Sequence, residues 1–357
     1  MGNLNKIKQD AIELLKDLIS IPSLSMEEKD TANRIELFFK DKQMNYHRKL
    51  NNVWAYNRHF KQEAPTLLLN SHHDTVAPNQ GWTLDPFKPF EKDGKIYGLG
   101  SNDAGGSLVS LIAVFRYFYH RADLKFNLVI AATAEEENSG VNGIEAIFAD
   151  LGKVDFAIVG EPTGMQMAIA EKGLVVLDCV ARGKSGHAAR DNGENAIIKA
   201  IQDIQWFHSY RFPKESETLG PIRMTVTMIQ AGVQHNIIPD TCQFTVDIRT
   251  TDAYSNEEIV EIVKRHVQSE VTPRSTRLQP SKIEKDHPLV QAAQNLGIRL
   301  FGSPTTSDQA VIPVPSVKMG PGESERSHTA DEFIYKQEIK EGIEKYIEFL
   351  EKLNEKL

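Results

Sequence analysis

The sequence predicts an α/β protein: a larger domain with a largely parallel central sheet flanked by helices, interrupted by a smaller ferredoxin-like βαββαβ domain. Short apolar runs of strand length alternate with helical patterns in the first part of the chain, and this alternation changes in the middle and then returns. A chain of 357 residues also exceeds what one hydrophobic core usually supports. We expect residues 1–172 and 284–357 to form the larger domain and residues 173–283 to form the insertion.

The larger domain is expected to begin with an amphipathic helix, because the apolar residues between Leu4 and Leu18 recur at helical spacing. Strand-like runs and a buried helix follow. The expected strands are 66–69, 126–132 and 156–159, and the expected helix is 107–119. After the insertion we expect a helix at 288–296, a strand within 311–319 and a closing helix at 337–353.

The insertion reads as two βαβ-like halves. Its expected strands are 174–181, 223–229, 241–250 and 276–278, and its first expected helix is 194–208. Ser255 and Glu258 lie three residues apart, as in a capping box, so a second helix should begin at Ser255. The resulting order βαββαβ is that of the split ferredoxin-like unit.

Composition excludes several classes of protein. Hydrophobic residues make up 40% and charged residues 25%, and the formal net charge is 41 − 49 = −8 without a basic stripe, which argues against a nucleic-acid binder. No apolar run is long enough to cross a membrane and no signal peptide is visible, so we expect a cytoplasmic protein. Cys179 and Cys242 form no CxxC pair and are expected to be buried free thiols.

Polar side chains collect directly after the expected strands of the larger domain. In an α/β sheet ligands bind beyond the carboxyl ends of the strands, so these residues should share one edge. A glycine-rich turn, GLGSNDAGG, adds an aspartate. The residues are His72 and Asp74, Asp103, the run Glu135–Glu137, Glu161, and His328.

This combination of side chains predicts a metal site. A lone histidine or a run of glutamates is usually a surface feature, but imidazole and carboxylate ligands without thiolates suit zinc, cobalt or manganese. Five or six such ligands are too many for one tetrahedral zinc ion. They suit two divalent ions bridged by a carboxylate.

The stretch NSHHDTV contains two adjacent histidines, of which one is the better candidate ligand. Side chains at i and i+2 of a strand point to the same side, so His72 and Asp74 should share a side while His73 points away. A metal-bound histidine typically donates its other N–H to an orienting oxygen. We therefore expect His72 to bind metal and Asp74 to orient it.

Six segments, in order, resemble the zinc aminoacylase–carboxypeptidase family, which includes acetylornithine deacetylases, succinyl-diaminopimelate desuccinylases and peptidases. They are SHHDTV, YGLGSNDAGG, ATAEEENSG, IVGEPTG, GHAARDNGENAI and GPGESERSH, and the resemblance spans about residues 66–335. It implies two divalent metal ions, foremost zinc, with cobalt or manganese as alternatives.

The resemblance also implies roles for the clustered residues. His72 and Glu161 would bind one metal, Glu137 and His328 the other, and Asp103 would bridge both. Glu136 would be the general base, with Asp74 the carboxylate behind His72. This register places Glu135 in the family's preceding acidic position, and a slip of one residue along the run is the alternative.

The insertion resembles the family's lid and dimerisation domain, which implies a homodimer. His187 would reach the partner's active site and stabilise the oxyanion, and Arg249 would bind a substrate carboxylate unless it pairs with a nearby acidic residue. Asn236, Thr306 and Ser307 occupy the family's substrate-contact positions.

Two positions depart from the family pattern. Gly105 stands where relatives often carry Lys or Arg, and Asp191 stands where they often carry Pro. Neither is an expected ligand or base.

The expected reaction is removal of an N-acyl group from an amino acid, with N-acetyl-L-ornithine in arginine biosynthesis as the first choice. N-succinyl-L-ornithine or N-succinyl-diaminopimelate is the near alternative, because the extra carboxylate needs only one more cation, such as Arg182, Lys184 or Arg190. A dipeptidase or carboxypeptidase comes next. A metal-free, inactive relative acting as a binding protein is the alternative from another class.

Overall fold

The computed structural model describes residues 2–190 and 192–357. Its internal contacts divide the chain into two compact units. Unit 1 comprises the residues up to Ile169 together with Lys282–Phe301 and Ser307–Leu357, and unit 2 comprises Ala170–Ser281 and Gly302–Thr306. We describe each unit separately. That residues 173–283 act as a lid and dimerisation domain stays a prediction.

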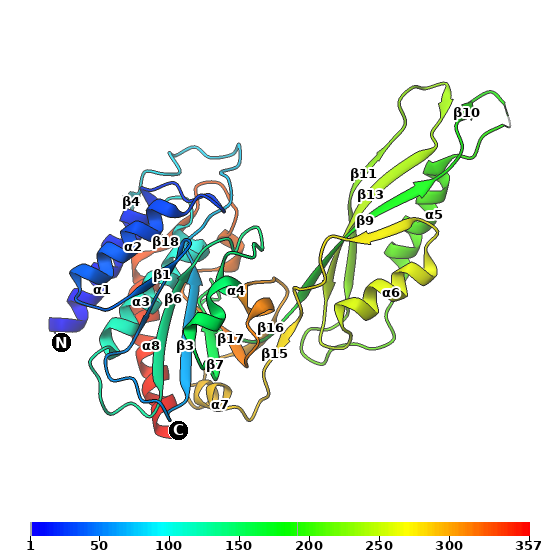
Figure 1. Cartoon of the computed structure of the whole chain (residues 1–357). Coiled ribbons are helices and arrows are strands. Elements are labelled where there is room, and N and C mark those ends of the chain that lie inside the picture. The colour runs from blue at the N-terminus through cyan, green and yellow to red at the C-terminus, as the bar shows by residue number, and fades with distance from the viewer. Residues whose placement is uncertain (1, 191) are drawn as a thin grey trace. The chain divides into compact units, whose positions relative to one another are not determined.

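Unit 1 is built on a twisted sheet whose centre is parallel, as predicted (Figure 1). Its four central strands, in spatial order, are β6 (Asn127–Thr133), β3 (Thr66–His72), β7 (Phe156–Val159) and β17 (Ser316–Lys318). The flanking strands are antiparallel: β1 (His47–Lys49) and β2 (Asn52–Tyr56) beyond β6, and β8 (Met167–Glu171) beyond β17. Two short strands, β15 (Ser281–Lys282) and β16 (Leu300–Ser303), complete the pattern.

Helices cover both faces of this sheet, which explains why its strands are apolar throughout rather than alternating. Leu67 and Leu69 of β3 pack into the larger core, whereas Leu68 packs with Ile144 and Ile147 into a smaller core. The larger core is completed by side chains of α1, α2, α3, α7 and α8. The helices of unit 1 are α1 (Gly2–Ile19), α2 (Lys29–Asp41), α3 (Gly106–Phe118), α4 (Ile144–Ile147), α7 (Pro288–Asn295) and α8 (Lys336–Lys356).

A separate three-stranded sheet in unit 1 joins two distant parts of the chain. It consists of β4 (Phe90–Lys92), β5 (Lys95–Tyr97) and β18 (Phe333–Tyr335), with β5 in the middle. The antiparallel pairing of β5 with β18 places residues 98–105, which follow β5, beside residues 328–332, which precede β18.

Unit 2 has the predicted ferredoxin-like arrangement. Its antiparallel sheet has the order β11 (Arg223–Ala231), β13 (Thr241–Thr250), β9 (Gly173–Arg182) and β14 (Glu270–Pro273). The helices α5 (Ala196–Ser209) and α6 (Asn256–His266) pack on this sheet, and both sides of the Ser255–Glu258 capping box are formed. A short ladder joins β10 (Gly186–His187) to β12 (Ile237–Ile238).

The predicted last strand of the insertion, 276–278, is wrong. The fourth strand is β14, Glu270–Pro273, which pairs antiparallel with β9. Pro273 argues against a strand in a sequence pattern, but β14 lies at the edge of the sheet, where a missing N–H leaves no ladder bond unmade.

Two further expectations concern single features. Cys179 and Cys242 are both buried free thiols, and burial raises the pKa of Cys179 to about 12. Across residues 2–190 and 192–357, no helix combines the length and the apolarity needed to cross a bilayer.

Candidate metal centre

The carboxyl ends of the four central strands deliver the candidate ligands to one edge of the sheet. His72 is the last residue of β3, the glutamate run follows β6, and Glu161 follows β7. His328 lies on the segment between β17 and β18. Because β6, β3, β7 and β17 are neighbours, side chains far apart in the sequence meet here.

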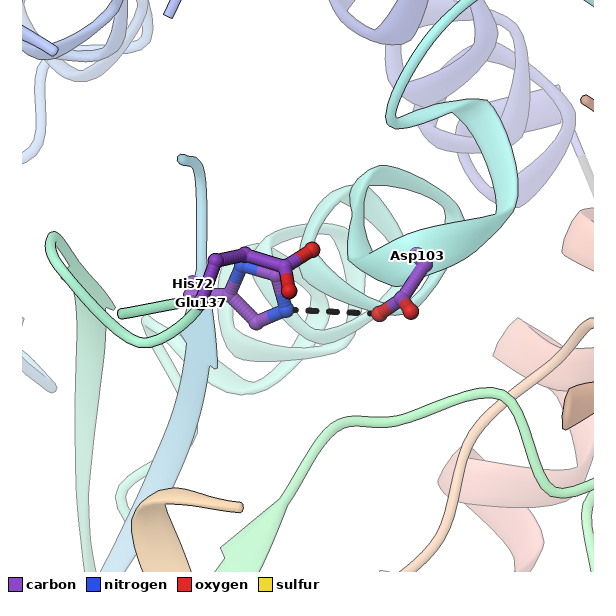
Figure 2. Close-up of side chains that lie close together, drawn as sticks. All are labelled: His72, Asp103 and Glu137. Carbon is purple, nitrogen blue, oxygen red and sulfur yellow. Dashed lines mark ion pairs between the residues drawn. The ribbon is translucent and has the colours of Figure 1, made fainter. Parts of the chain in front are cut away.

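These side chains form two groups that share Asp103. In the first group, the Nε2 atom of His72 lies 3.4 Å from Oδ1 of Asp103 (Figure 2) and 3.7 Å from Oε1 of Glu161. In the second, the Nε2 atom of His328 lies 3.0 Å from Oε2 of Glu137 and 3.6 Å from Oδ2 of Asp103. The two carboxylate oxygens of Asp103 therefore face different histidines, as a bridging ligand requires.

The residues fit a pair of divalent cations. Within the described chain, the Nε2 atom of His72 and the Oε1 atom of Glu161 are buried and have no hydrogen-bond partner. Buried polar atoms are normally satisfied, so two such atoms facing each other mark a place for a ligand. His72, Asp103 and Glu137 also offer ligand atoms that all lie within 4.8 Å of one another. Nitrogen and oxygen donors of this kind suit zinc, cobalt or manganese.

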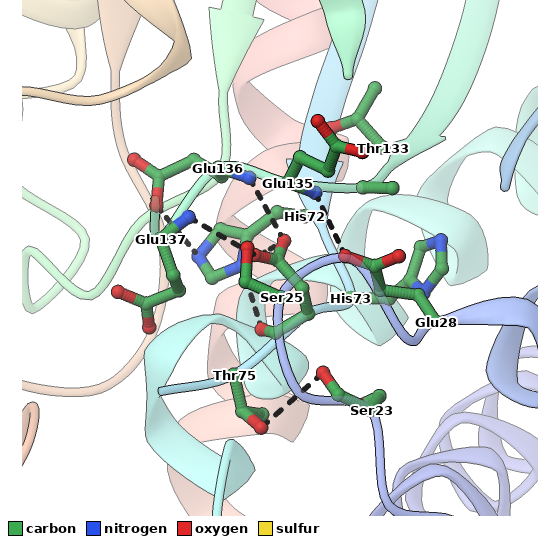
Figure 3. A network of polar contacts seen from close by, with 12 residues as sticks. Ser23, Ser25, Glu28, His72, His73, Thr75, Thr133, Glu135, Glu136 and Glu137 are labelled. Carbon is green, nitrogen blue, oxygen red and sulfur yellow. Dashed lines mark hydrogen bonds and ion pairs between the residues drawn. The ribbon is translucent and has the colours of Figure 1, made fainter. Parts of the chain in front are cut away.

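The two adjacent histidines have separate environments (Figure 3). His73 is buried away from the ligand cluster, with Nδ1 2.9 Å from the hydroxyl of Thr31 and Nε2 2.9 Å from the carbonyl of Asn51. Both of its ring nitrogens are thus occupied by protein partners. Burial lowers the pKa of His73 to about 4, so this ring is neutral at pH 7.

Asp74 contacts both His72 and the loop that carries the glutamate run. The Nδ1 atom of His72 lies 3.0 Å from the backbone carbonyl oxygen of Asp74 and 3.4 Å from its carboxylate. That carboxylate also accepts hydrogen bonds from the backbone N–H groups of Glu136 and Glu137, at 3.1 and 3.0 Å. Asp74 therefore orients the imidazole mainly through its carbonyl group, and its carboxylate fixes the loop that carries two further site residues.

Two residues of the N-terminal region support this loop and were missed in the sequence. The hydroxyl of Ser25 donates to the Asp74 carboxylate at 2.7 Å. The buried carboxylate of Glu28 accepts hydrogen bonds from Asn51 and from the backbone N–H of Glu135. Neither residue lies near a strand end in the sequence, so no local signal connects them with the site.

The three consecutive glutamates have different surroundings. The carboxylate of Glu135 accepts hydrogen bonds from the side chain and the backbone N–H of Asn142, away from the histidines. The carboxylate of Glu136 lies 3.8 Å from Nε2 of His72, and that of Glu137 contacts His328. Burial and the nearby carboxylates raise the pKa of Glu136 well above its ordinary value, although the charge of His72 opposes this. Among the described residues, Glu136 is therefore the glutamate of this run whose carboxylate lies beside the candidate ligands without forming a hydrogen bond.

Proton binding at the site reflects its crowded negative charge. Burial raises the pKa of Glu161 to about 8, with Asp103 adding to the effect. The hydrogen bond to Glu137 raises the pKa of His328 to about 9. Burial alone would raise the pKa of Asp103, but the nearby imidazole of His72 lowers it. Without metal, then, protons occupy part of the ligand set at neutral pH.

The loop that carries Asp103 bends sharply, and its backbone is hydrogen-bonded to a buried carboxylate. Gly100 has φ = +73°, and the backbone N–H groups of Asn102 and Asp103 donate to the buried carboxylate of Glu332. A Cβ atom at Gly105 would lie 2.4 Å from the carbonyl oxygen of Gly100, so this backbone admits no side chain there. The departure at Gly105 thus has a steric reason, whereas Asp191 lies outside the described residues.

The expected substrate residues of unit 2 form two separate pairs. Arg249 makes a two-pronged ion pair with Asp247, at 2.9 and 3.1 Å, and its Nη1 atom lies 3.4 Å from the hydroxyl of Thr306. The alternative pairing with an acidic residue is therefore present in the structure. Ser307, in unit 1, caps a short helical turn by accepting from the backbone of Gln309.

The second pair of unit 2 comprises His187 and Asn236. The two residues lie on adjacent segments, since the N–H of Ala188 donates to the carbonyl of Asn236 at 3.0 Å. The imidazole of His187 is exposed, and the side-chain oxygen of Asn236 is buried without a hydrogen-bond partner in the described chain.

Comparison with known proteins agrees with this geometry. The family described as Peptidase family M20/M25/M40 matches residues 68–352. The chain belongs to this family. The matched M20 region contains every candidate metal ligand and all of unit 2.

Curated M20 relatives carry two kinds of name. An acetylornithine deacetylase from Proteus mirabilis is 30% identical over 289 residues, covering 75% of this chain and 74% of the relative. A succinyl-diaminopimelate desuccinylase from Orientia tsutsugamushi (strain Ikeda) is 29% identical over 289 residues, covering 74% of this chain and 73% of the relative. The protein is thus similar to hydrolases that remove acyl groups, and these identities do not separate the two substrates.

Solved structures of M20 peptidases have the same fold. A tripeptidase from Staphylococcus aureus superposes with a TM-score of 0.78 at 20% identity, covering 98% of this chain and 99% of that one. A dinuclear metal-binding peptidase of the M20 family from Bacillus subtilis gives a TM-score of 0.74 at 18% identity, covering 99% of both chains. The chain is therefore an M20 metallohydrolase with a His–Asp–Glu group able to hold metal.

The raised pKa values predict that metal binding releases protons. Glu161 and His328 titrate near 8 and 9 without metal, and both must be deprotonated to act as ligands. Metal affinity should therefore be constant above about pH 9 and fall as the pH drops through 9 and 8. Calorimetric titration of chelated protein in buffers of different ionisation enthalpy should show proton release at pH 7. Binding without proton uptake by the buffer would contradict the assignment of these two ligands.

Proposed function

We propose that this M20 hydrolase removes the acetyl group from N-acetyl-L-ornithine at a centre of two zinc ions. The observation that carries the proposal is the division of the ligands into two histidine–carboxylate groups that share Asp103, with Glu136 beside them. His72 and Glu161 would hold one ion, and Glu137 and His328 the other. Cobalt or manganese would suit the same donors.

The mechanism assigns a proton transfer to Glu136. Bound divalent ions would polarise the scissile carbonyl and lower the pKa of a water towards ~7. The carboxylate of Glu136 accepts a proton from the attacking water and later gives it to the leaving amine nitrogen as the C–N bond breaks. Asp74 keeps Glu136 in place through the backbone N–H of that residue. No side-chain nucleophile is required.

Substrate recognition in unit 2 rests on a cluster of cations. Arg223 and Arg249 lie directly opposite each other on β11 and β13. The pKa of Lys172 is lowered mainly by burial and further by the positive charges of Arg223 and Arg249. Like charges placed opposite each other on a sheet are destabilising, so this arrangement has a cost that a bound carboxylate would offset. Asp247 neutralises one of the three cations, which leaves charge for an anionic substrate.

The same cations keep an N-succinyl substrate as the second candidate. A succinyl group adds one carboxylate, and the cluster holds more positive charge than one carboxylate needs. Of the cations named from the sequence, Arg182 is less suited, because it pairs with Glu270 at the surface. A dipeptidase or carboxypeptidase activity comes third.

The substrate assignment predicts metal-dependent release of ornithine. Zinc-loaded protein should release the amine from N-acetyl-L-ornithine faster than from N-succinyl-L-ornithine, and chelated protein should release none. The measurement is amine formation from both compounds side by side. Preference for the succinyl compound would reassign the acyl group, and cleavage of neither compound would remove ornithine from the proposal.

The role of Glu136 predicts different effects for neighbouring glutamates. Glu136→Gln should lower kcat by roughly 10²–10⁴-fold, because an amide cannot take the proton, while bound metal is unchanged. Glu135→Gln is the matched control, since its carboxylate faces Asn142, and its kcat should stay within a few-fold of the wild type. Steady-state kinetics and metal analysis of both variants decide which glutamate is the general base. A larger loss of kcat in Glu135→Gln than in Glu136→Gln would show that the assignment of roles along the glutamate run is shifted by one residue.

The topology of unit 2 supports a homodimer. Asn236 precedes β13 and Arg249 lies near its end, so the two substrate pairs are separated by about eight strand residues, or ~26 Å. One small substrate cannot contact both pairs of the same chain. His187 and Asn236 are therefore proposed to serve the active site of the partner subunit.

An exposed apolar edge in unit 2 offers the surface for this association. β11 is the edge strand, and Met228, Ile229 and Val233 on or just after it are 63%, 57% and 90% exposed. A long apolar edge with unpaired backbone groups favours pairing with another strand. The same edge of a second copy would satisfy it symmetrically.

This arrangement predicts that activity is recovered in a mixed dimer. Neither His187→Ala nor Glu136→Gln alone should be active, but mixing equal amounts should restore about a quarter of the wild-type activity, because half of the dimers then hold one intact site. His187→Ala mixed with the double variant His187→Ala/Glu136→Gln is the control and should stay inactive. No recovery in the first mixture would place His187 outside the partner's site.

A further inference from the structure

Glu332 lies directly beneath the loop that carries Asp103. Its side chain is buried, with the residue only 2% exposed. One carboxylate oxygen accepts hydrogen bonds from the N–H groups of Asn102 and Asp103, at 2.7 and 3.0 Å. The other accepts from the N–H of Gly100 at 3.3 Å. A single carboxylate thus organises three of four consecutive backbone N–H groups.

The shape of the loop directs three of its N–H groups towards one acceptor. Gly100 adopts a left-handed conformation, φ = +73°, which turns neighbouring N–H groups towards one point. Buried N–H groups left without an acceptor are costly, so removal of the carboxylate would let the loop relax. The Asp103 side chain leaves this loop with its oxygens 3.4 and 3.6 Å from the two histidines. Any relaxation would therefore change both separations.

Glu332 also belongs to the segment that presents His328. It follows His328 by four residues and immediately precedes β18, whose partner β5 leads into the Asp103 loop. A backbone hydrogen bond connects the same two segments, since the N–H of Gly98 donates to the carbonyl of Glu332 at 3.0 Å. The segment of His328 and the loop of Asp103 are thus bound to each other through one residue.

We propose that Glu332 is a positioning residue of the metal centre, which fixes the carboxylate of Asp103 relative to His72 and His328. Its carboxylate is occupied by the three loop N–H groups, so in this proposal it would contact neither metal nor substrate. The proposal rests on the metal centre described above but not on the choice of acyl group or amino acid.

Glu332→Gln is the most local test. Glutamine has nearly the same shape but only one acceptor oxygen, so its NH2 group would face the N–H of Gly100. Asp331→Asn is the matched control: Asp331 is the adjacent carboxylate on the same segment and accepts from the N–H groups of Thr83 and Leu84. The loop held by Asp331 carries no proposed ligand.

The first measurement needs no substrate. Chelated Glu332→Gln titrated with Zn²⁺ should bind metal roughly 10–100-fold more weakly than the wild type, as is typical when a partner behind a ligand is lost. Asp331→Asn should bind as the wild type does. Hydrogen–deuterium exchange should speed up across residues 98–104 in Glu332→Gln and across residues 79–85 in Asp331→Asn. Since no substrate is present, this result stands or falls separately from the proposed deacetylation.

A kinetic readout separates positioning from general stability. At saturating zinc, Glu332→Gln should lower kcat while KM stays within a few-fold, and thermal midpoints of both variants should be alike. Wild-type zinc affinity in folded Glu332→Gln, or equal losses in both variants, would overturn the proposal. Should Glu332→Gln fail to fold, Glu332→Asp keeps the charge and shortens the reach, and wild-type zinc affinity in that variant would overturn it equally.

Discussion

The active edge of unit 1 depends on a concentration of negative charge that the protein does not neutralise with its own side chains. Asp103, Glu136, Glu137 and Glu161 surround only two imidazoles, and burial raises the proton affinity of three of these carboxylates. Such a cluster is stable only when protons or cations occupy it. We therefore expect the charge that destabilises the metal-free protein to favour the binding of divalent ions at this site. Metal binding would then also stabilise the fold.

The protein meets this constraint by building the site on two supports. The sheet itself fixes His72, Glu136, Glu137 and Glu161, because the ends of β3, β6 and β7 are neighbours in one parallel ladder. Asp103 and His328 are held differently, on segments that leave the small sheet of β5 and β18. The proposed bridging ligand thus belongs to a different structural element from most of the candidate ligands that it must match. Asp74 ties together the segments of the first support, and Glu332 ties together those of the second. We propose that these two carboxylates set the spacing within each support.

The sequence predicted the residues carried by the main sheet more completely than those carried by the segments next to β5 and β18. Strand ends in a parallel sheet can be read from apolar runs, so the convergence of His72, the glutamates and Glu161 followed from local patterns. His328 was expected from the same pattern, although it belongs to the segment that leads into β18. The contacts of Ser25, Glu28 and Glu332 could not be predicted this way, because each connects segments far apart in the chain with no periodic signal. Short strands had the same difficulty: β4, β5 and β18 are three residues long, and Pro273 concealed β14. The spacing of apolar residues predicts where helices and strands lie. Buried hydrogen bonds between loops depend instead on how the whole chain folds, so no local spacing predicts them.

The two adjacent histidines illustrate how neighbouring residues acquire different chemistry. Both are buried, yet the Nε2 atom of His72 has no hydrogen-bond partner among the described residues, while both ring nitrogens of His73 are bonded to Thr31 and Asn51. The alternation of β3 directs one ring towards the carboxylates and the other towards α2. Carboxylates raise the pKa of His72 against the effect of its burial, and burial lowers that of His73. His72 is the candidate ligand because its surroundings leave one ring nitrogen unsatisfied. The direction in which the strand points each ring, and not the residue type, distinguishes the two histidines.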